Sequence, residues 1–453
     1  MSAAARLHVR PAPRPLSGSV PVPSDKSISH RALIFAALAA GRSALRGFSY
    51  GEDNVSTLEA FRKMGILVED EAAGSVSVQG AGLLGLKAPS ADLDCGNSGT
   101  TMRLLSGLLA AQPFQARLVG DASLSRRPMG RVVAPLRARG AAIRGNPHPT
   151  RPNDITAPLE IGPLDTGTRL APLEYSLEIA SAQVKSALLL SGLYASGPTV
   201  IEEPFVSRDH TERMLDALGI PIETAGPIVK LHPPADPASI AAFEVDLPGD
   251  LSAAAFLLVA AALIDGSHVT VRNTGLNPTR SGILDVLRQF GAETGITPHG
   301  AALNEPLGEV TARGGALRGA RVSGELSLRS IDEIPIACAL AARASGTSEF
   351  ADLSELRVKE SDRIALMSRV LRAFGVDTEE RADGLVIQGR PEGRLRAARV
   401  ESGGDHRIAM TAAVLGLVAD GETIIDDVDC IATSFPRFAG TLRALGADLE
   451  VRR

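Results

Sequence analysis

The chain is poor in large aromatic residues and in cysteine. Its 453 residues include no Trp, three Tyr and 12 Phe, so its interior must consist mainly of Ala, Leu, Val and Ile. The three cysteines, Cys95, Cys338 and Cys430, are far apart and form no C-x-x-C spacing. This pattern excludes a cysteine-rich zinc motif and a disulfide framework, and it predicts a reducing, cytoplasmic compartment.

The sequence also lacks an excess of positive charge and a long apolar run. The formal net charge is −5 at pH 7, whereas nucleic-acid-binding proteins usually carry a basic surplus. The strongest apolar run, Ala253–Ile264, has the length of a buried helix and is too short to cross a membrane. The N-terminal segment to Gly18 has no apolar core, so we expect no signal peptide.

Glycine is abundant, and six glycines end six amphipathic stretches at near-regular intervals of roughly 70 to 85 residues. They are Gly65, Gly140, Gly219, Gly291, Gly375 and Gly446. A glycine after the last helical turn is typical of a helix that ends in a left-handed conformation. The recurrence predicts six copies of one α/β unit.

A second, apolar stretch precedes each amphipathic one and begins with polar residues. The six apolar stretches are Ser27–Ala40, Ser98–Ala111, Gln183–Ser196, Leu251–Asp265, Glu333–Ser345 and His406–Asp420. Because they are hydrophobic nearly all round, we expect them to be buried helices. The predicted fold class is α/β, with two similar domains that each contain three βαβαββ-type units.

The chain is too long for a single core, and a boundary is expected near its middle. Three units precede about residue 235 and three follow it, with the Pro- and Ala-rich segment His232–Ser239 between them. We predict one domain over residues 20–240 and a second over residues 1–19 plus 241–453. The site is expected in the cleft between them.

The starts of the first three apolar stretches, and the segments after them, carry cations, hydroxyls and glycine. These residues are Lys26, Ser27 and Arg31; Asn97, Gly99, Thr100 and Arg127; and Ser181, Ala182, Gln183 and Arg208. Free N–H groups at a helix start favour an anion, and lysine and arginine add charge-assisted hydrogen bonds. Taken singly, each segment is equally compatible with an ordinary helix cap or a solvated surface.

The second half adds carboxylates to the cations. Asp332 lies at the start of the fifth apolar stretch, Arg407 lies in the sixth, and the run from Arg357 to Arg363 includes Lys359 and Glu360. If this run starts a helix, Lys359 and Arg363 share one face, as do Arg357 and Glu360. Such a charge run can also be a solvated surface.

The placement of these groups at corresponding points of repeated units carries the functional inference. Two facing halves would surround a small ligand with Lys26, Arg31, Arg127, Arg208, Lys359, Arg363 and Arg407. So much positive charge predicts two anionic groups, a phosphate and a carboxylate. Asp332 and Glu360 would be carboxylates placed for proton transfer.

Nine segments in this order resemble the 5-enolpyruvylshikimate-3-phosphate synthase family, in its class II branch. They are SDKSISHRA, GNSGTTMRL, RRPMGR, SAQVKSALL, RDHTE, NPTR, IDEIP, LRVKESDR and DHRIAM. The resemblance covers nearly the whole chain. It implies two globular domains of the inside-out barrel type. It also implies transfer of the enolpyruvyl group of phosphoenolpyruvate to the 5-hydroxyl of shikimate 3-phosphate, by addition and elimination with release of phosphate.

The resemblance also implies residue roles. For shikimate 3-phosphate it implies Lys26, Ser27, Arg31, Ser181, Ala182, Gln183, Arg208, Asp332 and Lys359. For phosphoenolpyruvate it implies Lys26, Asn97, Gly99, Thr100, Arg127, Gln183, Arg363 and Arg407. Asp332 matches the base near the 5-hydroxyl, Glu360 matches the group that moves a proton at the methylene carbon, and Lys26 contacts both substrates. No metal and no cofactor are expected, and we predict a monomer.

Two positions stand out against the family pattern. Ser434 stands where many relatives have a lysine. Gly99 stands where alanine in some relatives excludes the inhibitor glyphosate by bulk, so we predict a glyphosate-sensitive protein.

The sequence leaves two alternative functions. A UDP-N-acetylglucosamine enolpyruvyl transferase would need a cysteine near Val119–Arg126, and a six-unit ring around DNA would need evenly spread positive charge.

Overall fold

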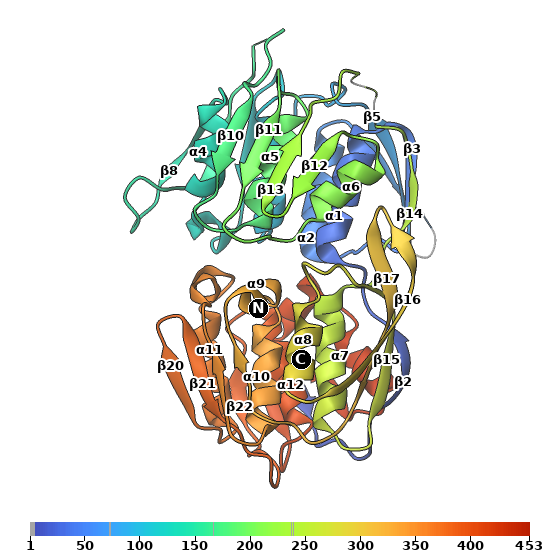
Figure 1. Cartoon of the computed structure of the whole chain (residues 1–453), viewed down its shortest axis with the longest axis vertical. Helices are drawn as coiled ribbons and strands as arrows, with labels where there is room; N and C mark the ends of the chain where they lie inside the picture. Colours follow the sequence, from blue (N-terminus) through green and yellow to red (C-terminus); the bar gives the residue numbers. More distant parts are fainter. Residues whose placement is uncertain (1–4, 72–73, 166, 237, 239) are drawn as a thin grey trace. The chain divides into compact units, whose positions relative to one another are not determined.

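The computed structural model describes residues 5–71, 74–165, 167–236, 238 and 240–453 (Figure 1). The first four residues and two positions of the predicted boundary His232–Ser239 lie outside this described part. The chain forms two compact units. Unit 1 contains the chain up to Pro23, Pro248–Gly300 and Pro306–Arg453, and unit 2 contains Ser24–Leu247 and Ala301–Glu305.

Each unit contains three pairs of helices. In unit 2 the apolar helices are α1 (Lys26–Leu38), α3 (Gly99–Leu109) and α5 (Ala182–Gly192), and the amphipathic ones are α2 (Glu52–Lys63), α4 (Gly130–Ala138) and α6 (His210–Ala217). In unit 1 the apolar helices are α7 (Leu251–Leu263), α10 (Ile334–Arg343) and α12 (His406–Gly416), and the amphipathic ones are α8 (Gly282–Gln289), α11 (Arg363–Ala373) and α13 (Phe438–Ala444). The described residues also form the short α-helix α9 (Glu325–Arg329) and the 3-10 helices η2 (Leu124–Arg126), η3 (Ser354–Val358) and η4 (Asp429–Thr433).

Among the described residues, each helix pair belongs to a four-stranded sheet. In unit 2 the sheet of the first repeat has the strand order β14 (Glu244–Asp246), β3 (Ala40–Arg46), β5 (Val76–Ala81), β4 (Leu67–Asp70). The sheet of the second repeat has the order β6 (Leu93–Asp94), β7 (Ala116–Val119), β9 (Ile155–Ile161), β8 (Ile143–Pro147). The sheet of the third repeat has the order β10 (Leu173–Ser176), β11 (Thr199–Glu202), β13 (Ile228–Leu231), β12 (Ile222–Ala225). In each order the first two strands are parallel and the other pairs antiparallel. The predicted βαβαββ unit is confirmed.

Unit 1 repeats this pattern. Its sheets have the order β2 (Ser17–Pro21), β15 (His268–Gly275), β17 (Glu305–Arg313), β16 (Glu293–Ala302); β18 (Arg321–Val322), β19 (Thr347–Phe350), β21 (Gly384–Gln388), β20 (Thr378–Arg381); and β22 (Arg399–Glu401), β23 (Thr423–Asp426), β1 (Arg6–Val9), β24 (Leu449–Arg452). The N-terminal strand β1 pairs with both β23 and β24 and so completes the sixth repeat.

Two strands join a sheet other than the one that their place in the sequence suggests. Strand β2 directly precedes α1, yet it pairs in parallel with β15 of the fourth repeat. Strand β14 directly precedes α7, yet it pairs in parallel with β3 of the first repeat. The first and fourth repeats have thus exchanged their first strands, and the chain passes from one unit to the other after each of them.

The apolar helices form the cores of the units. Every residue of α7 is buried, and α7, α10 and α12 lie side by side within unit 1 (Figure 1). Small side chains allow this packing: in unit 2, a Cβ on Gly107 of α3 would lie only 2.0 Å from the carbonyl oxygen of Ala187 in α5. The expectation of buried apolar helices is confirmed.

The ends of the helices follow the sequence signals. The six glycines after the amphipathic helices all have positive φ, as a left-handed helix end requires, from 76° at Gly219 to 107° at Gly446. Five of the six apolar helices begin with a side chain that accepts a hydrogen bond from a backbone N–H of the first turn. These caps are Asp25, Ser98, Ser181, Asp250 and Asp405.

Candidate functional site

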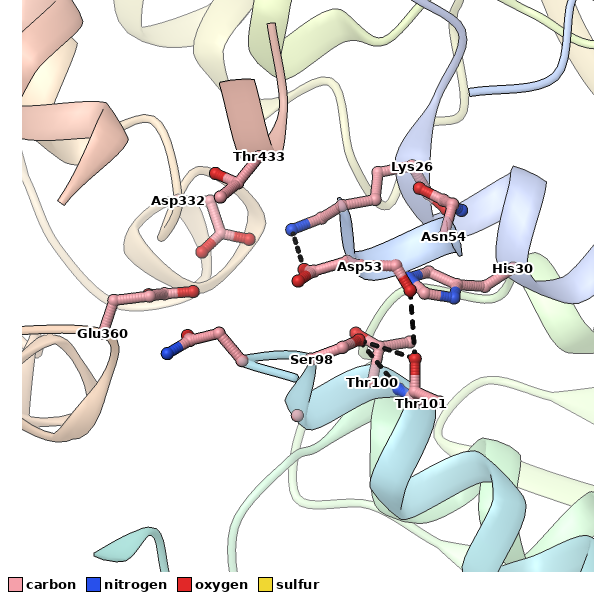
Figure 2. A network of polar contacts seen from close by, with 12 residues as sticks. Lys26, His30, Asp53, Asn54, Ser98, Thr100, Thr101, Asp332, Glu360 and Thr433 are labelled. Carbon is pink, nitrogen blue, oxygen red and sulfur yellow. Dashed lines mark hydrogen bonds and ion pairs between the residues drawn. The ribbon is translucent and has the colours of Figure 1, made fainter. Parts of the chain in front are cut away.

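Lys26 is the first residue of α1, and its ammonium group is held by the start of α2. Nζ lies 2.8 Å from Oδ2 of Asp53 (Figure 2). Asn54 donates a hydrogen bond of 3.0 Å from Nδ2 to the carbonyl oxygen of Lys26. The N-terminus of α2 therefore fixes both the backbone and the amino group of Lys26. Asp53 was not singled out from the sequence, because it lies on the second helix of the repeat.

Arg31, one turn further along α1, is buried and reaches two other helices. Its Nε donates to Oγ1 of Thr211 at 2.7 Å and its Nη2 to Oγ of Ser186 at 2.7 Å. Nη1 donates to the carbonyl oxygen of Ser27 at 2.9 Å. Burial lowers the pKa of Arg31 to about 10, which leaves the guanidinium charged near neutral pH. Arg31 thus connects the starts of α1, α5 and α6.

Four of the predicted site residues meet at the start of α3. Asn97 accepts a hydrogen bond of 2.5 Å at Oδ1 from Nη2 of Arg127. Thr100 accepts one of 3.0 Å at Oγ1 from Nε2 of Gln183, which lies in the first turn of α5. The structure therefore brings these polar groups together around one helix N-terminus, where backbone N–H groups favour an anion.

Gly99 leaves room for two guanidinium groups beside this helix start. A Cβ on Gly99 would lie 2.7 Å from Nη1 of Arg103 and 3.3 Å from Nη1 of Arg127. Arg103 in turn donates a hydrogen bond of 2.7 Å from Nη1 to Oε1 of Gln183. A side chain at position 99 would therefore displace cations that surround the start of α3.

A chain of hydroxyl groups lies behind these residues. Nδ1 of His30 is 2.7 Å from Oγ1 of Thr57, which is 2.7 Å from Oγ1 of Thr101. Thr101 donates to Oγ of Ser98 at 2.7 Å and is also 3.2 Å from the carbonyl oxygen of Asp53 (Figure 2). Burial lowers the pKa of His30 to about 3, so its imidazole is neutral near pH 7. This chain of hydrogen bonds connects α1, α2 and α3 at the ends that carry the candidate site.

Ser181 and Arg208 flank the last pair of helices of unit 2. Ser181 caps α5, since its Oγ accepts a hydrogen bond of 3.5 Å from the N–H of Val184, and Ala182 is the first residue of the helix. The backbone N–H of Ser181 donates a hydrogen bond of 3.1 Å to Oε1 of Glu203. Arg208 precedes α6 in the segment that leads from β11 to that helix.

In unit 1 the candidate residues gather around Arg363, the first residue of α11. Nε of Arg363 is 2.8 Å from Oδ2 of Asp405, and Nη2 is 2.6 Å from Oε2 of Glu360. Nη1 is 3.5 Å from Oδ1 of Asp332. Burial acts against the charged form of Arg363, but the three carboxylates outweigh it and raise the pKa above its ordinary value. The guanidinium is therefore a permanent cation at the centre of this cluster.

Two further cations reach Asp332. Nζ of Lys359 lies 3.6 Å from Oδ1 of Asp332. Arg407, in the first turn of α12, donates a hydrogen bond of 2.8 Å from Nη1 to the carbonyl oxygen of Asp332. The structure therefore brings together all five candidates that the sequence placed in unit 1, namely Asp332, Lys359, Glu360, Arg363 and Arg407.

The conditional expectation that Lys359 and Arg363 share a helix face is wrong. Helix α11 begins only at Arg363, because Asp362 accepts a hydrogen bond of 3.0 Å at Oδ1 from the N–H of Ala365 and caps the helix there. Lys359 directly follows the short turn η3 and lies outside α11. The same start excludes a shared helix face for Arg357 and Glu360.

The NPTR segment has a local role in unit 1. Arg280 at its end is buried, and Nη2 lies 2.6 Å from Oδ1 of Asp250 and 3.0 Å from Oγ of Ser252. Asp250 caps α7, so Arg280 supports the start of that helix. An ion pair of this kind cannot be read from the sequence, because the partners are thirty residues apart and their spacing carries no helical or strand period.

Cys95 is fully buried, as expected for a packed small residue. Within the described residues, no group of three or more His, Cys, Asp and Glu side chains could hold a metal ion. None of the helices there has the length and apolarity that a membrane crossing requires.

Comparisons with known proteins agree in one family. Residues 11–442 match the family model of EPSP synthase (3-phosphoshikimate 1-carboxyvinyltransferase). The chain is 46% identical over 429 residues to the 3-phosphoshikimate 1-carboxyvinyltransferase of Geobacter sulfurreducens, covering 95% of this chain and 96% of that protein. It is 48% identical over 423 residues to that of Herpetosiphon aurantiacus, covering 93% and 95%.

A solved structure agrees with the sequence comparisons. The EPSP synthase of Acinetobacter baumannii superposes with a TM-score of 0.87 at 39% identity, covering 99% of this chain and all of that chain. The predicted α/β fold with buried parallel helices is thereby confirmed. The chain belongs to the EPSP synthase family.

Proposed function

We propose that the polar residues at the helix starts of the two units carry out the reaction of this family. The chain transfers the enolpyruvyl group of phosphoenolpyruvate to the 5-hydroxyl of shikimate 3-phosphate and releases phosphate, a step of aromatic amino acid biosynthesis. The observation that best supports the residue assignment is the arrangement around Arg363, whose guanidinium contacts both candidate proton-transfer carboxylates, Asp332 and Glu360.

The proposal assigns shikimate 3-phosphate to a set of hydroxyls, amides and cations. The set consists of Lys26, Ser27, Arg31, Ser181, Ala182, Gln183, Arg208, Asp332 and Lys359. Its support in unit 2 is that Arg31 connects the starts of α1, α5 and α6 with a permanent positive charge. A phosphate dianion is favoured by helix N-termini and by charge-assisted hydrogen bonds.

Phosphoenolpyruvate is assigned to Lys26, Asn97, Gly99, Thr100, Arg127, Gln183, Arg363 and Arg407. Hydrogen bonds link Arg127 to Asn97 and Gln183 to Thr100, so their side chains are preorganised around the start of α3. Arginines at this substrate would neutralise its carboxylate and stabilise the charge that develops on the departing phosphate.

The addition requires one proton delivered to C3 of phosphoenolpyruvate and one removed from the 5-hydroxyl, and the elimination of phosphate reverses only the transfer at C3. Asp332 would remove the proton of the 5-hydroxyl as its oxygen attacks C2 of phosphoenolpyruvate. Glu360 would deliver a proton to C3 in the same addition and remove one from C3 as phosphate leaves. Lys26 would stabilise charge at both substrates. A general acid or base of this kind contributes roughly 10²–10⁴-fold to the rate.

A phosphate-release assay tests this function. Phosphoenolpyruvate and shikimate 3-phosphate together should give continuous release of phosphate, whereas phosphoenolpyruvate with UDP-N-acetylglucosamine should give none. Release with the sugar nucleotide alone would overturn the assignment of the acceptor. A monomeric state and a cytoplasmic location remain predictions from the sequence.

A further inference from the structure

A buried cluster of one lysine and two glutamates lies beside the candidate site in unit 2. Lys185 is 1% exposed, and its Nζ lies 2.6 Å from Oε2 of Glu203 and 2.7 Å from Oε1 of Glu212. Nζ also donates to the carbonyl oxygen of Ser207 at 3.3 Å. The ammonium group therefore donates hydrogen bonds to Glu203 and Ser207 and forms a further ion pair with Glu212. None of these charged side chains has a role in the proposed reaction.

The positive charge of Lys185 is favoured in the folded protein. Burial acts against the charged form of Lys185, but Glu212 and Glu203 outweigh it and raise the pKa of Lys185 above its ordinary value. Burial raises the pKa of Glu212. Buried ion pairs often stabilise a fold no more than well-packed apolar residues of similar volume would, and in some proteins they specify local geometry instead.

Ser207 directly precedes Arg208, and all three of its polar groups are hydrogen-bonded to this cluster. The N–H of Ser207 donates to Oε2 of Glu203 at 3.2 Å, and its hydroxyl donates to Oε1 of Glu203 at 2.6 Å. Its carbonyl oxygen accepts from Lys185. Ser207 is thereby fixed, and the planar peptide bond that follows it limits the backbone freedom of Arg208. The cluster therefore sets the backbone position from which the Arg208 side chain extends.

The same carboxylate also holds the start of α5. Oε1 of Glu203 accepts a hydrogen bond of 3.1 Å from the N–H of Ser181, the cap of the helix. The hydroxyl of Ser181 is engaged separately with the first turn. Glu203 thus connects the turn that carries Ser181, Ala182 and Gln183 with the segment that carries Arg208.

We propose that Glu203, oriented by Lys185 and Glu212, is a positioning residue that sets the distance between the Ser181 turn and Arg208 and so determines the affinity for shikimate 3-phosphate. This inference rests on the proposed function, which assigns both segments to that substrate. It predicts a larger effect on shikimate 3-phosphate than on phosphoenolpyruvate, because Ser181 and Arg208 are assigned to shikimate 3-phosphate alone. Of the residues assigned to phosphoenolpyruvate, Gln183 lies in the turn that Glu203 holds, and it keeps its separate hydrogen bond to Thr100.

The variant Glu203→Gln tests the proposal in the full-length protein. The amide keeps the size of the side chain but loses the charge that pairs with Lys185 and one of the two oxygens that accept hydrogen bonds from Ser207. Calorimetric titration with shikimate 3-phosphate should give a Kd at least tenfold higher than that of the unchanged protein. The KM for phosphoenolpyruvate, measured at saturating shikimate 3-phosphate, should stay within twofold.

The matched control is Glu202→Gln in the neighbouring position of β11. Glu202 is exposed, and its Oε2 accepts a hydrogen bond of 2.9 Å from the hydroxyl of Ser176 on the surface of the sheet. The same chemical change there should leave both affinities unchanged. If Glu203→Gln does not fold, Ser207→Ala replaces it, because it removes a single hydrogen bond of the cluster and should raise the same Kd about threefold.

The outcomes are separable. An unchanged Kd for shikimate 3-phosphate in the folded variants overturns the positioning role. Equal weakening of both substrates with a lower Tm also overturns it, since that is the behaviour of general destabilisation. Failure of the unchanged protein to bind shikimate 3-phosphate contradicts the proposed function itself, whatever the variants do.

Discussion

The guanidinium of Arg363 and the carboxylate of Asp405 form an ion pair of 2.8 Å between side chains that are 1% and 0% exposed. Asp405 also caps α12 through the N–H of Arg407 at 2.9 Å. One carboxylate therefore positions two of the arginines assigned to phosphoenolpyruvate, one through its side chain and one through the start of its helix.

Replacing Asp405 by Asn should destabilise unit 1. The change leaves the buried Arg363 without its nearest counter-charge and weakens the cap of α12. Breaking a buried pair of this kind costs about 3 kcal/mol. The free energy of unfolding, from urea denaturation at pH 7, should fall by about that amount, and an unchanged value would contradict the account of this pair.

The effect of Asp405 should also depend on pH. Burial alone would raise the pKa of Asp405, but the charge of Arg363 outweighs it and holds the pKa below its ordinary value. A depressed pKa contributes stability that is complete above the unfolded value of about 4 and is lost as the pH falls through the folded value. The difference between the unchanged protein and Asp405→Asn should therefore shrink below about pH 4.

His30 should destabilise the folded protein in mild acid. Its folded pKa of about 3 lies well below the ordinary value, because burial excludes the charged form. The unfolded chain therefore binds more protons between these two values, and stability falls as the pH is lowered through about 6.5. The expected slope from this one group is about 1.4 kcal/mol per pH unit.

The comparison variant is His30→Asn, which removes the titrating group and retains a polar partner for Thr57. Urea unfolding at pH 7, 6 and 5 should show a shallower loss of stability in the variant than in the unchanged protein. Parallel pH profiles would contradict the neutral, buried state of His30.

Gly99→Ala should weaken phosphoenolpyruvate binding. The added methyl group would lie 2.7 Å from Nη1 of Arg103, so the guanidinium groups beside α3 must move. We expect the KM for phosphoenolpyruvate to rise severalfold with little change in the KM for shikimate 3-phosphate. Inhibition by glyphosate, measured as competition against phosphoenolpyruvate, should be present in the unchanged protein and weaker in the variant.

Much of the fold could be predicted because its signals are local. The glycine that ends each of the six amphipathic helices acts within a few residues, as does the hydroxyl or carboxylate that caps five of the six apolar helices. The helices of the six pairs therefore lie where the periodicity placed them.

The exchange of β2 and β14 could not be predicted in this way. Each strand directly precedes an apolar helix, as in the other repeats, and nothing in its own residues names its partner. Their pairing is decided by contacts between segments far apart in the sequence, such as β14 with β3, whose paired residues are 200 residues apart. A single sequence carries no local record of such contacts.

The sequence identifies the cations of the candidate site but not most of the side chains that hold them. Lys26 and Arg363 lie at helix starts, where the sequence pattern itself indicates an anion site. Their carboxylate partners Asp53 and Asp405 look like ordinary first-turn or capping residues, so only the three-dimensional structure shows what they hold. The position of Lys359 outside α11 was missed as well, because Asp362 caps that helix and the helix begins only at Arg363, the last residue of the charge run.

The assignment of proton transfer to Asp332 and Glu360 is tested most directly by steady-state phosphate release with Asp332→Asn and Glu360→Gln. Both substitutions preserve size and remove the ability to exchange a proton. We predict that kcat falls about 100-fold or more in each variant, while the Kd for shikimate 3-phosphate changes by less than about threefold. A kcat close to that of the unchanged protein in either variant, with shikimate 3-phosphate still bound, would contradict the account.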